Sequence, residues 1–246
     1  MTMQQLDILA FGAHPDDVEL SCSGTIISHI QQGKKVGVID LTRGELGTRG
    51  NAALRHQEAM RAAEIMGLTV RENMGFADGF FTNDSMHKIA LIKKIRQYRP
   101  EIVLATALYD RHPDHGRSAE LIADACFLAG LRKVETLDAK GELQEAWRPR
   151  LVCHYVQDTY ISPNFVVDIS ECINKKIEAI KAYTSQFHDE GYKKDSDEPE
   201  TYISDPDYLE RVYARSREVG KQANCRFAEG FVVKRVVGVK NLFDLM

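Results

Sequence analysis

The chain has 246 residues, of which 43% are hydrophobic and 28% are charged, and its formal net charge is -4 at pH 7. These proportions are ordinary for a globular protein. The mild negative charge gives no general attraction to nucleic acid or to an anionic membrane. We therefore expect one domain over residues 1–246, with neither nucleic acid nor a membrane as its partner.

The sequence also lacks the usual signals of export. Residues 1–7 contain no basic stretch followed by an apolar core, and no segment approaches the roughly 18 apolar residues of a membrane span. The five cysteines are widely spaced and never form a CxxC pair, which argues against a disulfide framework and against a cysteine-zinc cluster. A reducing, cytoplasmic location is expected.

Apolar runs and segments with helical spacing alternate along the first 130 residues. The expected strands are residues 6–12, 35–41, 68–73 and 101–106. The expected helices are residues 18–32, 52–66, 85–99 and about 115–130. Gly67 follows the second helix as a C-terminal stop, and Pro100 follows the third. This alternation predicts a Rossmann-like three-layer α/β fold, with a mostly parallel sheet and helices on both faces.

Beyond residue 130 the periodicity weakens. The expected elements are a polar connection at 134–149, strands at 151–156 and 165–169, a helix at 170–187, a helix at 208–223 and an apolar strand or contact segment at 227–239. Ser170 is a plausible N-cap of the first of these helices. The polar residues 188–207 predict an exposed loop that can close over a site.

The first strand is followed by the loop Gly12-Ala13-His14-Pro15-Asp16-Asp17. A dinucleotide-binding protein would place a G-x-G-x-x-G turn here, whereas an imidazole and two carboxylates favour a cation over a phosphate. His14 and Asp17 can turn toward one point, which leaves Asp16 free. Either aspartate is also a good N-cap for the helix that follows, and this alternative stays open for one of the two.

A second cluster, Tyr109-Asp110-Arg111-His112-Pro113-Asp114-His115, follows the fourth strand. Because the carboxyl ends of parallel strands share one edge of the sheet, the two loops are expected to meet. His14, Asp17 and His115 would then form a three-ligand zinc site with one open position, and such a donor set also accepts Fe²⁺.

Three further residues fit roles around such a site. Asp16 suits a general base, and His112 suits a group that stabilises an oxyanion and protonates a leaving amine. Asp114 is expected to hold His112 in the correct tautomer. The remaining histidines have no comparable neighbours and are expected to be structural or solvated.

The segments Ala13–Asp17 and His112–His115 together resemble the signature of the LmbE/PIG-L family of zinc-dependent N-acetylglucosaminide deacetylases. The resemblance covers nearly the whole chain. It implies the same roles: zinc ligands His14, Asp17 and His115, the base Asp16, and His112 at the oxyanion.

Within that family, the details resemble the bacillithiol-biosynthesis branch, which deacetylates N-acetylglucosaminyl malate. Arg55 and Arg111 would then bind the malate carboxylates, although each also fits a surface or ion-pair role. Asp78 fits a sugar-hydroxyl contact or a plain turn, and Tyr208 fits the oxyanion or simple packing. The resemblance also implies a homo-oligomer, with a hexamer as the suggested form.

Three rival functions stay open. A related amidase or a chitooligosaccharide deacetylase would share the zinc site and differ in the pocket. A metal-binding regulatory protein would keep the fold without turnover, but it would need neither Asp16 nor His112. A nucleotide-binding protein is disfavoured because the glycine fingerprint is missing.

Overall fold

The computed structural model describes residues 5–245, and a seven-stranded sheet in the order β3-β2-β1-β4-β5-β7-β6 forms its centre. The strands are β1 Ile8–Gly12, β2 Val36–Thr42, β3 Val70–Phe76, β4 Ile102–Ala105, β5 Leu151–Tyr155, β6 Phe165–Asp168 and β7 Ala228–Val232. Neighbours from β3 to β5 are parallel, and β7 runs antiparallel to both β5 and β6. The prediction of a mostly parallel sheet is therefore confirmed. Residues 1–4, which carry part of the argument against an export signal, lie outside the described residues.

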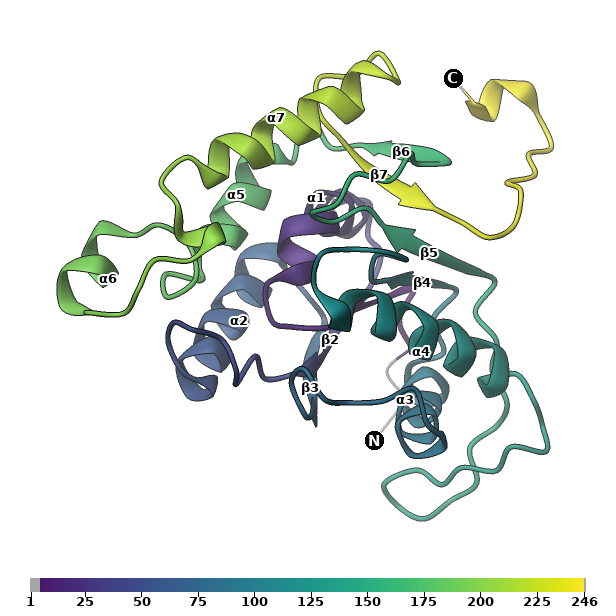
Figure 1. Cartoon of the computed structure of the whole chain (residues 1–246). Helices are drawn as coiled ribbons and strands as arrows, with labels where there is room; N and C mark the ends of the chain where they lie inside the picture. The colour runs from purple at the N-terminus through teal and green to yellow at the C-terminus, as the bar shows by residue number, and fades with distance from the viewer. Residues whose placement is uncertain (1–4, 246) are drawn as a thin grey trace.

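Helices cover both faces of this sheet (Figure 1). They are α1 Asp17–Gln31, α2 Ala52–Met66, α3 Ser85–Tyr98, α4 Pro113–Ala129, α5 Ile173–Lys181, α6 Glu190–Asp195 and α7 Tyr208–Lys221. Side chains of α1, α2 and α5 pack in one core on one face, and those of α3 and α4 pack in a second core on the other. The three-layer α/β prediction is confirmed as well.

Strand β1 shows why the layers form. Ile8 and Ala10 belong to the core under α1, whereas Leu9 and Phe11 belong to the core under α3 and α4. Successive side chains of a strand point to opposite faces, so an uninterrupted apolar run is buried on both sides. This is the usual environment of a central parallel strand.

The C-terminal third differs from the sequence prediction at several boundaries. Helix α5 covers only Ile173–Lys181, and the predicted N-cap is wrong: the Ser170 hydroxyl instead accepts hydrogen bonds from the backbone N–H groups of Arg226 and Phe227. Of the expected apolar segment at 227–239, only β7 forms a strand. The expected loop at 188–207 contains α6 and a short 3₁₀ helix, Tyr202–Ser204. Contacts with the two residues before β7 explain the first difference, because they hold Ser170 outside the helix.

The order of the strands indicates which edge of the sheet is expected to bind a ligand. β1 lies between β2 and β4, so the chain winds one way from β1 to β3 and the other way from β4 to β5. Ligands of such sheets bind beyond the carboxyl ends of the strands at this switch point. Among residues 5–245, no helix is long and apolar enough to cross a membrane.

Candidate active site

The loop after β1 is held in a constrained conformation. A Cβ on Gly12 would lie 2.9 Å from the carbonyl oxygen of His14, so the close approach of the chain requires glycine. The backbone N–H of His14 donates to Oδ2 of Asp17 over 2.8 Å. Asp16 has a φ of 117°, a conformation that residues other than glycine rarely adopt and that is typical of functional sites. Asp16 occupies the N-cap position of α1, but its side chain makes no capping hydrogen bond.

The loop after β4 leads directly into α4. Helix α4 begins at Pro113, two residues earlier than predicted, and His112 is its N-cap. The backbone N–H of Asp114 donates to Nδ1 of His112 over 3.3 Å. Since Nδ1 is the acceptor, the proton of the neutral His112 ring resides on Nε2.

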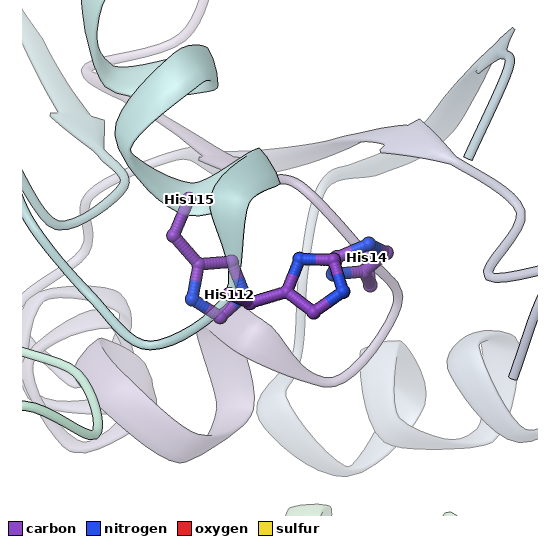
Figure 2. Close-up of side chains that lie close together, drawn as sticks. All are labelled: His14, His112 and His115. Carbon is purple, nitrogen blue, oxygen red and sulfur yellow. The ribbon is translucent and has the colours of Figure 1, made fainter. Parts of the chain in front are cut away.

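The two loops meet, as their places on neighbouring strands predict. Figure 2 shows the rings of His14, His112 and His115 gathered between the first turn of α4 and the loop before α1. The ring centroids of His14 and His112 are 4.6 Å apart, and those of His112 and His115 are 5.2 Å apart. One nitrogen of each ring lies within 4.8 Å of the others, so the three rings can serve one ligand.

The Asp17 carboxylate completes this group. Its Oδ1 lies 3.2 Å from Nε2 of His115, and its Oδ2 lies 3.5 Å from Nδ1 of His14. Ligand atoms around a tetrahedral zinc ion with bonds of about 2.0–2.1 Å are about 3.3 Å apart. The chemistry of His14, Asp17 and His115 therefore suits a small divalent cation, and each histidine lies near this spacing from a different oxygen of Asp17.

The second nitrogen of each of these two histidines faces a carboxylate. Nε2 of His14 lies 3.0 Å from Asp78 and 3.3 Å from Asp114, and Nδ1 of His115 lies 2.5 Å from Asp110. Histidine ligands of metals commonly donate their other N–H to a carboxylate, which fixes the ring and its tautomer. His14, Asp78 and Asp114 are also close enough to form a second possible donor group.

These carboxylates raise the affinity of both rings for positive charge. Burial lowers the pKa of His115, but Asp17 and Asp110 outweigh it and raise that pKa to about 9. Burial also opposes the charged form of His14, and Asp114, Asp17 and Asp78 still hold its pKa well above the usual value. The surroundings of both rings thus favour positive charge.

Two residues have contacts other than those expected. The Asp114 carboxylate does not hold His112: it accepts hydrogen bonds from the N–H of Gly79 over 2.8 Å and from Arg117 over 2.5 Å, and it faces His14. Only the backbone of Asp114 touches His112, because α4 starts there and turns the carboxylate away. Asp78 bonds His14 through Oδ1, and its Oδ2 accepts from the N–H of Leu46 over 2.9 Å.

Asp16 is buried beside the candidate metal ligands, and its carboxylate is already ion-paired. Its Oδ2 lies 3.1 Å from Nη2 of Arg55, which also donates to Gln186. Burial raises the pKa of Asp16 to about 7, and the positive charge of Arg55 limits the rise. Arg55 was expected at the substrate, but it is itself buried on α2 and is engaged with Asp16 and Gln186.

All these groups line one cleft of about 210 Å³. Arg111 lies on its wall, where Nε is 3.1 Å from Asp158 and the guanidinium covers the ring of Tyr202 at 4.8 Å. Tyr208 lines the cleft from α7 and is 5% exposed, and its hydroxyl has no hydrogen-bond partner among the residues that the structure describes.

Sequence reasoning missed three residues of this wall, Gln157, Asp158 and Arg215. Nε2 of Gln157 donates to Oδ1 of Asp17 over 2.5 Å and lies 3.3 Å from Nε2 of His115. Gln157 and Asp158 follow β5, which is parallel to β4 and ends at the same edge of the sheet. That topological signal was available in the sequence.

Comparison with known proteins assigns the fold and the two loops to one family. Residues 9–126 match the family described as PIG-L, GlcNAc-PI de-N-acetylase. The chain belongs to the PIG-L/LmbE family of deacetylases. This match contains most of β1, the candidate ligands His14, Asp17 and His115, and most of α4.

Relatives of this PIG-L/LmbE protein include two deacetylases. The chain is 28% identical to the diacetylchitobiose deacetylase of Thermococcus kodakarensis, over 91% of this chain and 81% of the relative. It is also 28% identical to a probable N-acetyl-alpha-D-glucosaminyl L-malate deacetylase 2 of Bacillus anthracis, over 73% of this chain and 81% of the relative. This PIG-L/LmbE chain is accordingly an enzyme of a metal-dependent deacetylase family.

The fold has a solved counterpart. The conserved protein TT1542 from Thermus thermophilus superimposes with a TM-score of 0.83 at 34% identity, over 96% of this chain and 98% of that one. The agreement extends to the region after residue 126, which the PIG-L/LmbE match does not reach.

Proposed function

We propose that the protein binds zinc and hydrolyses the N-acetyl group of an N-acetylglucosaminide, with N-acetylglucosaminyl malate as its substrate. One observation carries this proposal: the buried carboxylate Asp16 lies beside a three-donor cation site in a cleft, and its pKa is about 7. A site that only stores a cation does not need a further buried carboxylate with that pKa beside its ligands.

The cation would be held by Nδ1 of His14, the carboxylate of Asp17 and Nε2 of His115. When bound, zinc polarises the acetamide carbonyl and lowers the pKa of the attacking water toward about 7. The surrounding carboxylates Asp78, Asp114 and Asp110 keep the two rings oriented toward that ion.

Asp16 is placed to take a proton from the attacking water. Its pKa near 7 leaves a substantial fraction ionised at neutral pH, and it makes the protonated form acidic enough to return the proton to the leaving amine. Arg55 holds this carboxylate in place and stabilises its ionised form.

His112 is placed to stabilise the oxyanion and to face the leaving amine. Burial and the neighbouring His14 and His115 lower the pKa of His112, so this ring is neutral at pH 7. Its Nδ1 accepts from the backbone of Asp114, which leaves the Nε2–H available to donate. A donor that meets charge developing in the transition state stabilises it more than it stabilises the ground state.

The malate branch is supported by the Bacillus anthracis relative and by arginine side chains in the cleft. The Thermococcus kodakarensis relative supports the rival substrate, a chitooligosaccharide. Both would undergo the same amide hydrolysis, since both carry the same N-acetyl group.

A direct competition separates the two. Zinc-loaded enzyme is given N-acetylglucosaminyl malate or N,N'-diacetylchitobiose, and released acetate is measured with a chelator-treated sample as the control. The proposal predicts a higher kcat/KM on the malate compound and no turnover after chelation. A higher kcat/KM on diacetylchitobiose would make a chitooligosaccharide the substrate instead. If neither compound releases acetate, the protein binds a metal but lacks this activity.

A further inference from the structure

The charged groups of the cleft are almost all paired with one another. Asp16 lies 3.1 Å from Arg55, and Asp158 lies 3.1 Å from Arg111. Asp78 and Asp17 lie 3.0 and 3.2 Å from histidine nitrogens of the donor set. Both arginines that the sequence assigned to substrate recognition therefore already have a carboxylate partner.

Arg215 is the exception. It lines the cleft and is half-buried, and no carboxylate lies within ion-pair distance of it among the residues that the structure describes. Its guanidinium donates one hydrogen bond, to the backbone carbonyl of Gln157. A guanidinium has five N–H donors, so most of them are available to a ligand.

Its position is fixed by the helix that carries it. Arg215 and Tyr208 are seven residues apart on α7, which places both on the face that borders the cleft. The hydrogen bond to Gln157 holds Arg215 next to a residue whose side chain contacts Asp17. Arg215 is therefore part of the same cleft wall as the candidate metal ligands His14, Asp17 and His115.

We infer that Arg215 recognises an anionic group on the aglycone of the substrate, and that it makes the enzyme prefer N-acetylglucosaminides with a carboxylate-bearing aglycone over neutral ones. The inference rests on the proposed deacetylation of such a glycoside. Arginine pairs with carboxylates through two parallel hydrogen bonds, which adds geometric selectivity to the charge.

The alternative is that Arg215 only positions Gln157. The two roles predict different ratios of kcat/KM between an anionic and a neutral substrate. Loss of a positioning contact would slow every substrate by the same factor, because Gln157 contacts Asp17 and His115, which would serve every substrate alike. Loss of an anion contact would affect only a substrate that carries the anion.

The test compares N-acetylglucosaminyl malate with methyl N-acetylglucosaminide in wild type, Arg215→Gln and the control Arg217→Gln. Arg217 is an exposed neighbour on α7 that lies over Phe227, away from the cleft. Because hydrogen bonds to charged groups are worth about 10- to 100-fold, the kcat/KM ratio of the malate compound to the methyl compound should fall by that factor in Arg215→Gln, mainly through KM. Arg217→Gln should keep the wild-type ratio.

Equilibrium binding provides a readout without turnover. Calorimetry with glucosaminyl malate and methyl glucosaminide should show the same selective loss in Arg215→Gln. If binding depends on Arg215 but no acetate is released, the inference stands and the deacetylase proposal fails. The inference is overturned if wild type binds the two compounds equally, or if Arg215→Gln leaves their ratio unchanged.

Discussion

A buried ion triad beneath the active-site loop offers a sharp test of how the scaffold is held. Arg71 on β3 donates to both oxygens of Asp40 over 3.0 Å and also pairs with Glu19. The exposed fraction of each of these side chains is at most 3%. Glu19 lies on α1 two residues after Asp17, so the triad anchors the helix that carries the candidate metal ligand Asp17.

Arg71→Met keeps the bulk of the side chain and removes its charge, which leaves two buried carboxylates without their cation. Breaking a buried pair in this way costs about 3–5 kcal/mol of the free energy of unfolding. Asp40→Asn should cost only about 1 kcal/mol, because Arg71 keeps Glu19 as its partner. The control Lys193→Met removes an exposed pair with Glu200 and should cost less than about 1 kcal/mol.

The loss should depend on pH. Burial raises the pKa of Asp40 to about 6 in the folded protein, and Arg71 limits the rise. A folded pKa above the unfolded value of about 3.9 means that the folded state holds the proton more tightly, so stability falls as pH rises between these values. Without Arg71 the pKa of Asp40 rises further, and Arg71→Met should lose less stability at pH 5 than at pH 8. Urea unfolding at both pH values measures this, and a loss below about 1 kcal/mol at pH 8 would refute the reasoning.

Two further substitutions test the site itself. Asp110→Asn removes the charged partner of His115 and should weaken zinc binding by about 10- to 100-fold, measured by competition with a chelator; unchanged affinity would show that Asp110 does not orient the ligand. His112→Ala should lower kcat by about 10²- to 10³-fold with zinc content unchanged, because it removes an oxyanion donor. Loss of zinc from His112→Ala would instead make His112 a ligand.

The first half of the fold was predictable because its signals are local. Strand β1 is an apolar run that ends at Gly12, and α2 ends at Gly67, whose φ of 81° is the left-handed conformation expected of a C-terminal stop. The meeting of the loops with His14 and His115 followed from parallel topology alone. These inferences need only neighbouring residues and the handedness of crossovers.

The contacts that sequence reasoning missed join distant parts of the chain. Gln186 is 131 positions from Arg55, and this contact, with the ion pair to Asp16, gives Arg55 partners within the protein where a substrate contact was expected. The side-chain direction of Asp114 depends on where α4 begins, and an error of two residues there changes which group it faces. The sequence assigned Arg215 no role in the cleft, because its place there depends on the packing of α7 against the segment after β5.

The central claim is that Asp16 is the base of a zinc-dependent deacetylase. The most direct test is acetate release from N-acetylglucosaminyl malate by zinc-loaded wild type and Asp16→Asn, with bound zinc quantified in both. The account predicts that the variant keeps its zinc and loses at least about 10²-fold in rate, the usual contribution of a general base. A variant that keeps both its zinc and its rate would contradict the role of Asp16, and a zinc-loaded wild type that releases no acetate would contradict the activity.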